Sequence, residues 1–360
     1  MKTEQPFFFT LALTALAGLS GCSQFPSSQS DSVAQNPPAQ FAPLTHLYDY
    51  HLIDRDTREP TNLPGLVKKL AHADVIFVGE YHGNQASHLL QAQLQAALFA
   101  QHPNQILSLE QFERDDQAVI ERYLESQIGE KTLTDETDAW PNYTGSYRPM
   151  IEFAKRHFLP VVAANAPGRI VRCVGRHGPD YLNRLPPNQR DWVAQNPFYD
   201  PPGYQPRFFE FVTGQAHGES TSPKKTDVTQ RQRQSYQAQL LRDNTMAESL
   251  LNAKRDHPDA QILHLNGAFH SDEFLGTVAA LAQRAPQLRI AVISPVRIEP
   301  EQAHGWLAQA DEQTFEKGDF LYLIQPQPAE YVQAQKRRAA MQKQFKQAEQ
   351  KPCLPMRTAS

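Results

Sequence analysis

Two histidines occupy equivalent places behind two apolar segments of the sequence. His82 ends the segment 74–82 and His270 ends the segment 261–270, and in each a glycine lies three residues before the histidine. Apolar runs of this length predict buried strands of a parallel sheet, and the glycine lets the backbone turn sharply where the strand ends. Ligands of open α/β sheets bind at the carboxyl edge of the strands. Two histidines delivered to that edge by separate strands therefore predict a functional site.

Carboxylates accompany both histidines. Glu80 lies two residues before His82, and Glu110 ends a further predicted strand. Imidazole and carboxylate groups are ligands of divalent transition metals, so His82, Glu110 and His270 form a candidate metal set. The same groups, with Glu80, could serve as general acid and base around a bound water. For one histidine after a strand, a structural role as a core or cap residue is the more frequent outcome. Two in equivalent positions favour a site.

Other residues are weaker candidates. His88 follows His82 by six residues, so it either faces the same cavity or lies on the surface. Arg169 follows the third predicted strand, where it forms either a surface ion pair or a binding site for an anion such as a carboxylate. His217 and Met246 are candidates of lower rank, since a methionine at helical spacing usually belongs to the core.

The elements that must position these residues alternate between strand and helix. Strands are predicted over 74–79, 105–110, 159–165, 261–267, 288–296 and 320–324. Helices are predicted over 85–99, 115–124, 147–158, 229–254 and 274–284. This alternation predicts an α/β fold, a mostly parallel doubly wound sheet flanked by helices.

Composition adds limits and boundaries. The 360 residues are 40% hydrophobic and can bury a sizeable core, and the formal net charge of -4 gives no reason to expect nucleic acid as a partner. We predict a signal peptide over 1–21, a flexible Ser-, Gln- and Pro-rich tether over 22–43 and the folded domain over 44–328. An aromatic-rich helical lid insertion is predicted at about 179–256, and a polar basic tail over 329–360.

The cysteines bear on the compartment. The apolar run 7–21 is of signal-peptide length, and Leu-Ser-Gly-Cys22 at its end resembles the bacterial lipobox. That resemblance implies a lipid such as palmitate on Cys22, and Ser23 after it implies sorting to the outer membrane. The alternative is an ordinary signal peptide with a chance cysteine. Cys173 and Cys353 either pair or are unrelated thiols.

Six separated motifs carry a family resemblance. They are Val78-Gly-Glu-Tyr-His82 with Asn84 and His88, Leu109-Glu110, Tyr147-Arg-Pro-Met-Ile-Glu-Phe-Ala154, Ala164-Asn165 with Arg169, Arg242-Asp-x-x-Met-Ala247 and Gly267-Ala-Phe-His270. In this order they resemble the ChaN family of haem-binding uptake lipoproteins, within the wider Tiki/TraB-type group of domains with two Gly-x-x-His motifs. The resemblance covers roughly residues 44–296.

The resemblance implies two kinds of site. The ChaN branch implies haem binding and iron acquisition, with Tyr147 as a candidate iron ligand and subunits that pair around haem. His82, His88, Arg169 and His270 are then the other candidate haem-binding residues. The wider group implies a metal-dependent hydrolase at His82 and His270 with a glutamate. From the residues alone, Tyr147 is more often a packing aromatic, with an axial phenolate as the alternative.

We rank three hypotheses. The first is a lipid-anchored haem-binding protein for iron uptake at the bacterial outer membrane, a possible homodimer with a possible outer-membrane receptor as partner. Arg169, Arg148 or Arg172 would face the haem propionates. The second is a metal-dependent hydrolase of the protease or esterase type that uses Glu80, His82, Glu110 and His270. The third is an interaction module whose histidines are structural.

Overall fold

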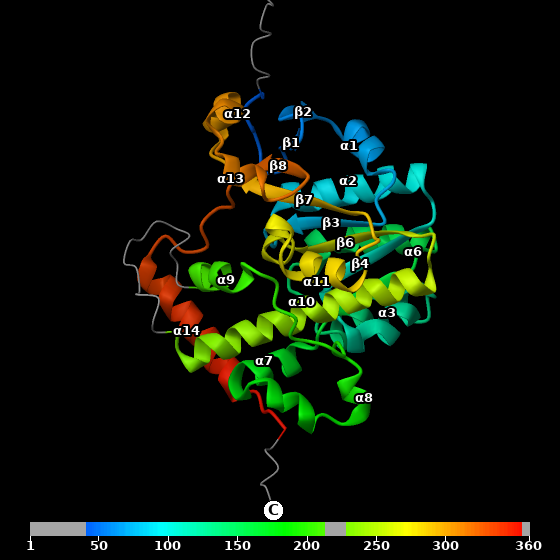
Figure 1. Ribbon diagram of the computed structural model, residues 1–360, viewed down its shortest axis with the longest axis vertical. Helices are drawn as coiled ribbons and strands as arrows, with labels where there is room; N and C mark the ends of the chain where they lie inside the picture. Colours follow the sequence, from blue (N-terminus) through cyan, green and yellow to red (C-terminus); the bar gives the residue numbers. More distant parts are fainter. Residues whose placement is uncertain (1–40, 213–227, 355–360) are drawn as a thin grey trace, which may run out of the picture. The chain divides into compact units, whose positions relative to one another are not determined.

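The structure is a computed structural model that describes residues 41–212 and 228–354. In that part of the chain, eight strands form one sheet in the order β2-β1-β8-β7-β3-β6-β4-β5 (Figure 1). The strands are β1 (Tyr50–Asp54), β2 (Glu59–Thr61), β3 (Val75–Glu80), β4 (Gln105–Glu113), β5 (Val161–Asn165), β6 (Gln261–Gly267), β7 (Ile290–Arg297) and β8 (Phe320–Ile324). The predicted signal peptide, Cys22 and His217 lie outside the described residues.

Most of the sheet is parallel. β8, β7, β3, β6, β4 and β5 pair in parallel, while β1 runs antiparallel to both β8 and β2. Every strand predicted from the sequence is present. The mostly parallel doubly wound α/β fold is therefore confirmed, and the antiparallel pair at one edge is an addition.

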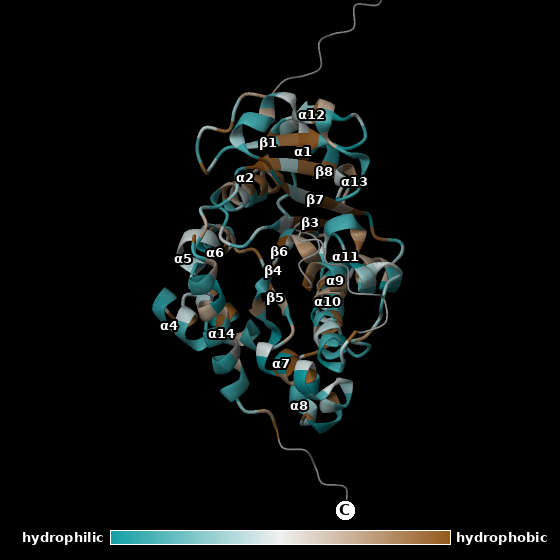
Figure 2. Ribbon diagram, turned by 90° about the vertical axis from the view of Figure 1, so that its left-hand side faces the viewer, coloured by the Kyte–Doolittle hydropathy of each residue, from teal (hydrophilic) through white to brown (hydrophobic). Residues whose placement is uncertain are grey.

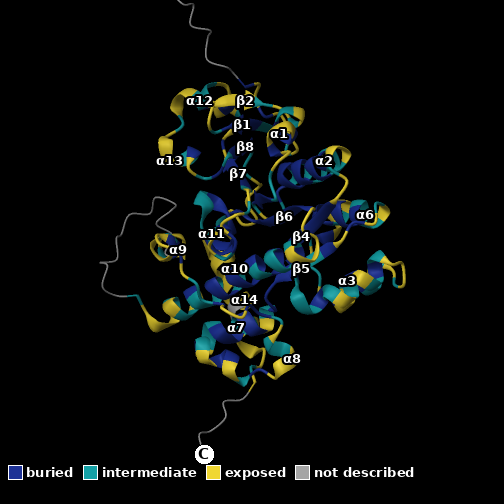
Figure 3. Cartoon of the chain, turned by 45° about the vertical axis from the view of Figure 1, so that its right-hand side comes forward, coloured by how far each residue is buried: buried dark blue, intermediate teal, exposed yellow. Residues whose placement is uncertain are grey.

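Helices cover both faces of this sheet. One face packs against α1 (Leu63–Leu70), α2 (Gln85–Gln101) and α6 (Arg148–Arg156), and the other against α10 (Gln230–Asp256) and α11 (Gly276–Arg284). Figure 2 shows the strands stacked between these two sets of helices. Strands β3 to β8 and the inner side of α2 are largely buried, while the edge strand β2 and the outer helix surfaces are more exposed (Figure 3). This division is what the near-continuous apolar strands require.

The remaining helices are short or peripheral. They are α3 (Gln117–Leu124), α4 (Glu130–Glu136), α5 (Tyr143–Ser146), α7 (Gly168–His177), α8 (Pro187–Arg190), α9 (Tyr204–Val212), α12 (Trp306–Gln309), α13 (Glu312–Phe315) and α14 (Ala334–Gln350). Single 3₁₀ turns include η4 (Ala268–His270), which carries the second histidine directly beyond β6. In residues 41–212 and 228–354, no helix is long and apolar enough to cross a membrane.

Alternation along the strands decides which side chains share a face. On β3, Ile76 and Val78 belong to the core beneath α2, while Val75 and Phe77 belong to the core beneath α10. Because successive strand residues point to opposite faces, Glu80 shares the α2 side with Val78. On β4, Ile106 lies in the core beneath α10, so Glu110, four residues later, lies on the α10 side. The two carboxylates therefore enter the site from opposite faces of the sheet.

Only part of the predicted lid insertion, about 179–256, lies apart from the helices that pack on the sheet. α10 packs its Ala247 and Leu250 into the core against the sheet, so residues 230–256 are one of the two helical layers and not a lid. Ahead of it, α9 buries Tyr204 and Phe208 against Tyr236 of α10. This confirms that aromatic side chains of the segment pack together. A covering role for the residues before 230 stays a prediction.

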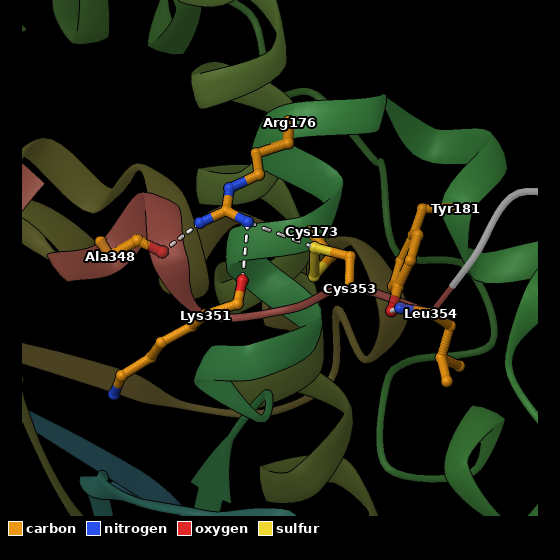
Figure 4. The surroundings of a disulfide bond; sticks show 7 residues. All are labelled: Cys173, Arg176, Tyr181, Ala348, Lys351, Cys353 and Leu354. Carbon is orange, nitrogen blue, oxygen red and sulfur yellow. Dashed lines mark hydrogen bonds between the residues drawn. A yellow bond between two sulfur atoms is a disulfide. The ribbon is translucent and has the colours of Figure 1, made fainter. Parts of the chain in front are cut away.

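The two ends of the domain differ from the expected boundaries. Phe41 and Leu44 are already buried against the β1–β8 edge, so packing begins inside the predicted tether. At the other end α14 is an exposed helix, as the basic tail predicts, but the segment behind it is fixed. Cys353 forms a disulfide with Cys173 of α7 (Figure 4). The sequence left open whether Cys173 and Cys353 pair, and the structure shows that they do, which joins the tail to the domain.

Candidate functional site

Glu80 is the centre of a buried polar cluster on the α2 side of the sheet. Its carboxylate accepts hydrogen bonds from the Tyr147 hydroxyl (2.6 Å), the Gln91 amide (2.7 Å) and the His82 Nδ1 (2.9 Å). The Glu80 side chain is fully buried, whereas 45% of the His82 side chain is exposed. A carboxylate is an acceptor, so His82 donates from Nδ1, and its Nε2 is the atom left for a ligand. The Trp140 ring stands edge-on to the imidazole at 4.8 Å.

A second cluster lies on the α10 side. His270 is placed between two carboxylates: its Nδ1 is 2.7 Å from Asp243 Oδ1 and its Nε2 is 3.3 Å from Glu110 Oε1. The backbone N–H of Gly267 donates to Glu110 at 2.5 Å. Tyr204 donates to Asp243 at 2.7 Å, which fixes this carboxylate from α9. Both nitrogens of His270 are thus engaged by the protein.

The two clusters meet over Gly267. A Cβ atom at this position would lie 2.8 Å from Cε1 and 2.9 Å from Nε2 of His82, and 3.5 Å from Glu110 Oε2. Any larger residue would have to displace the imidazole. The glycine of the second Gly-x-x-His motif therefore makes room for the histidine of the first, and this explains why the two motifs work as a pair.

The charges distinguish the two histidines. Burial alone would lower the pKa of His270, but the charges of Glu110 and Asp243 outweigh it and raise this pKa to about 10. At neutral pH His270 is therefore an imidazolium. Burial would raise the pKa of Glu110, but the charge of His270 holds it well below its usual range. Burial also lowers the pKa of His82, and the hydrogen bond to Glu80 with the charge of Glu110 outweighs that and raises it.

Tyr147 is part of the support of Glu80. Its side chain is 1% exposed, and its hydroxyl proton is given to Glu80. Burial and the Glu80 charge raise the pKa of Tyr147 far above 10, the ordinary value for a phenol. In this arrangement Tyr147 is a neutral donor and not a phenolate. Its candidacy as an axial ligand would require that hydrogen bond to break.

His88 lies in the same cluster and not on the surface. It is buried, with Nδ1 3.0 Å from Gln91 Oε1 and 3.6 Å from Glu80 Oε2, and its ring is edge-on to Tyr147 at 5.1 Å. Its Nε2 is buried without a hydrogen-bond partner. The sequence allowed His88 to face the same site as His82 or to lie on the surface, and the structure shows the buried position.

The predicted anion-binding arginines are engaged elsewhere. Arg169 lies at the carboxyl edge, but its guanidinium pairs with Asp115 and stacks over the Trp192 ring at 4.8 Å. Arg148 pairs with Glu130. For Arg169 this is the surface ion pair that the sequence offered as the alternative. Arg172 is half-buried, and burial with the charge of Arg176 lowers its pKa.

The predicted metal set is brought together only in part. Glu110 contacts His270, while His82 adjoins Glu110 across Gly267. Among the residues that the structure describes, no group of three or more His, Cys, Asp or Glu side chains is arranged to hold a metal ion. A metal at His270 would have to displace one of its two carboxylate contacts. The set therefore stays a prediction.

Several residues of the site were not singled out from the sequence. Asp243 is the main one, because it belongs to α10 and reaches His270 across 27 positions of the chain. Arg242-Asp243 opens one of the six motifs that carry the family resemblance, but the spacing alone assigned no role to Asp243. Met246, a weak candidate from the sequence, is fully buried in α10.

Fold and site together define a class: an α/β domain with a mostly parallel sheet and two Gly-x-x-His strand ends that meet at its carboxyl edge. The chain belongs to the family described as haem-binding uptake, Tiki superfamily, ChaN, whose model matches residues 66–281.

One solved structure supports the fold. The structure described as cofacial heme binding to ChaN of Campylobacter jejuni matches with a TM-score of 0.55 at 16% identity, over 79% of this chain and 100% of that chain. An erythromycin esterase matches with a TM-score of 0.40 at 14% identity, over 81% and 87%. No curated protein matches this sequence.

Proposed function

We propose that this protein binds haem at the carboxyl edge of its sheet, with His82 as the iron ligand, and takes part in haem or iron uptake. The observation that carries the proposal is the state of His82. Its imidazole is exposed, its Nδ1 is held by Glu80, and no hydrogen bond within the described residues occupies its Nε2. A carboxylate behind a ligating histidine fixes the ring and raises its basicity. Membership of a haem-binding family supports the choice of ligand.

The donor set fits haem better than a small cation. The His82 imidazole, 45% exposed, stands beside the aromatic surface of the Trp140 ring, so one imidazole is accessible next to an apolar wall. When bound, haem supplies the iron and its visible absorbance. The protein supplies an oriented Nε2 at His82, while Tyr147 and Gln91 hold the carboxylate that orients it. His270 is engaged on both nitrogens and stabilises the edge.

A haem titration of the chain from about residue 24, followed by absorbance, tests this assignment. Wild-type protein is expected to give a saturable Soret shift at a simple ratio. His82→Ala should weaken binding at least about tenfold through loss of the axial bond, whereas Tyr147→Phe and His88→Ala should bind with an unchanged Soret position. A Soret change in Tyr147→Phe with normal binding by His82→Ala would transfer the ligand role to Tyr147.

The proposal includes a membrane location. The lipobox-like sequence before Cys22 supports a lipid-anchored protein of the bacterial outer membrane. Cys22→Ser should move the protein from the membrane to the soluble fraction of cells and abolish palmitate labelling. An outer-membrane receptor is the partner that this proposal expects. Crosslinking in haem-fed cells followed by purification should recover it, and the absence of any crosslinked membrane protein would contradict this partner.

Pairing of subunits also belongs to the proposal. The related ChaN structure is described as binding haem cofacially, which motivates a haem-dependent homodimer for this chain. Light scattering after size-exclusion chromatography, with and without haem, should show a doubled mass only with haem, and His82→Ala should stay monomeric. A mass that haem does not change would remove the dimer and leave haem binding intact.

Hydrolysis is the second candidate, favoured by one observation. The Asp243–His270–Glu110 chain is a set of buried acid and base groups beside an exposed histidine. With a divalent metal held by His82, Glu110 and His270, such groups would suit a protease or esterase. Purified protein that carries a stoichiometric metal and hydrolyses an ester or peptide would favour it. Apoprotein and His82→Ala should then both be inactive.

A further inference from the structure

Arg297 lies beside His82 at the same edge of the sheet. It is the last residue of β7, which pairs in parallel with β3 so that Val78 lies opposite Ile293. His82 and Arg297 each follow these partners by four residues. His82 itself lies in the turn after β3, and Tyr81 links the two residues, because it directly precedes His82 and its ring centroid lies 3.6 Å from the Arg297 guanidinium. Gly267, Glu110 and His270 approach His82 from β6 and β4, on the opposite side of β3.

The Arg297 side chain is held in place without being neutralised. Its guanidinium lies 3.6 Å from the centroid of the Tyr81 ring, the residue directly before His82. Tyr81 is itself fixed, since it packs against the core and its hydroxyl lies 3.5 Å from the carbonyl of Pro295. Arg297 is exposed, and within the described residues no carboxylate pairs with it. Stacking on an aromatic ring orients a guanidinium while leaving its N–H edge open.

The surrounding charges make this arginine the natural partner of an anion. Arg169 and Arg148 are already paired with Asp115 and Glu130. On the β6 side of His82, the carboxylates of Glu110 and Asp243 outnumber the one imidazolium of His270, so the cluster is negative and repels negative groups. A ligand with carboxylates that is centred on His82 is therefore directed toward β7. A guanidinium with a free edge can bind a carboxylate with two parallel hydrogen bonds.

We propose that Arg297, stacked on Tyr81, is the residue that binds a haem propionate and so orients haem across the edge of β3. This inference rests on the proposed haem binding at His82. Arg297 then takes the place of Arg169, which the sequence suggested as the partner of the propionates. The propionates would therefore lie toward β7.

The test compares hemin with hemin dimethyl ester, in which both propionates are esterified, in the same detergent buffer. Wild-type protein should bind hemin about tenfold more tightly than the ester, about 1.4 kcal/mol. Arg297→Gln should bind hemin about tenfold more weakly and lose the preference, with an unchanged Soret position because His82 is intact. Arg169→Gln is the matched control, an exposed arginine of the same edge, and should keep the preference.

The outcomes separate this inference from the function beneath it. Equal affinity of wild-type protein for hemin and its ester overturns the role of Arg297 without any variant. A preference that survives in Arg297→Gln and vanishes in Arg169→Gln also overturns it and returns the role to Arg169. Absence of a saturable Soret shift in wild-type protein instead refutes haem binding itself.

Discussion

Glu80→Gln tests the first cluster most directly, because it keeps the size of the side chain and removes its charge. Glu80 Oε1 accepts from Tyr147 and His82, and Oε2 accepts from Gln91. A glutamine offers one acceptor oxygen and one NH₂ donor, so it cannot accept on both sides. With its oxygen at the Oε1 place, its NH₂ group meets the NH₂ group of Gln91.

The magnitude follows from how the network can relax. Gln91 can rotate its amide, so that its oxygen accepts from the new glutamine and its NH₂ group turns to Nδ1 of His88, which in the wild-type protein donates to the Gln91 oxygen at 3.0 Å. His88 must then carry its proton on Nε2, which is buried without a partner, so one donor is left unpaired and the charge assistance of the Glu80 hydrogen bonds is lost. Hydrogen bonds to charged groups contribute about 1.5–3 kcal/mol, neutral ones about 1 kcal/mol, and an unpaired buried donor costs about 1–3 kcal/mol, so we expect a loss of unfolding free energy of about 2–3 kcal/mol. Glu80→Ala, which leaves buried donors unpaired, should cost about 3–5 kcal/mol.

Urea denaturation at pH 7 followed by circular dichroism measures these losses, and NMR titration of the histidine Cε1–H signals follows His82. In Glu80→Gln the pKa of His82 should fall, because the charge of Glu80 is lost and the hydrogen bond that His82 donates becomes a neutral one, while the charge of Glu110 remains. Tyr147→Phe is the control that removes a single donor and should cost less than Glu80→Ala. Equal losses in Glu80→Gln and Glu80→Ala would refute the relaxation through Gln91, and an unchanged pKa of His82 would refute its coupling to Glu80.

Three further predictions concern stability. Burial lowers the folded pKa of His264 to about 3 from 6.5, so the unfolded chain takes up a proton first as the pH falls below 6.5, and unfolding free energy is lost by up to about 1.4 kcal/mol per pH unit. His264→Gln should show a shallower loss between pH 7 and 4 in urea denaturation, and equal slopes would contradict this. Asp243→Asn should lower the pKa of His270 from about 10 and cost about 3–5 kcal/mol. The stability that comes from this raised pKa is complete below pH 6.5 and is lost as the pH rises to about 10, so the cost of Asp243→Asn should shrink between pH 6.5 and 10. An unchanged denaturation midpoint at pH 7 would contradict the pair. Cys353→Ser removes a disulfide that spans 180 positions. It should lower the unfolding free energy by less than about 5 kcal/mol, the limit set by chain entropy, because the exposed α14 also gains freedom in the folded state. Limited proteolysis should then cut the tail first, and a tail that stays resistant would contradict this explanation.

The strands, and the edge of the sheet at which they place functional residues, could be predicted from the sequence because strand signals are local. Continuous apolar runs with a terminal glycine marked β3 and β6, and parallel direction alone placed His82 and His270 at one edge. The opposite faces of Glu80 and Glu110 follow by counting alternate positions only after the packing has placed Val78 beneath α2 and Ile106 beneath α10.

Partners that come from other elements were not accessible in this way. Asp243 reaches His270 from α10, Asp115 takes Arg169 out of the candidate anion site, and Cys353 meets Cys173 across 180 positions. In each case the residue types are common and the spacing carries no period. Only the packing of helix on sheet decides which of many possible partners lies within hydrogen-bonding or bonding distance.

The contrast between the two histidines is the strongest argument about function. Each has a carboxylate at Nδ1, Glu80 for His82 and Asp243 for His270, so the pair begins as two equivalent oriented imidazoles. Glu110 breaks the equivalence, because it contacts the Nε2 of His270, while no hydrogen bond within the described residues occupies the Nε2 of His82. One histidine thus becomes a buried cation that stabilises the edge, and the other remains an exposed and oriented imidazole. A single open imidazole of this kind suits one axial bond to a large planar ligand, whereas a tightly chelated metal would need both histidines open at once.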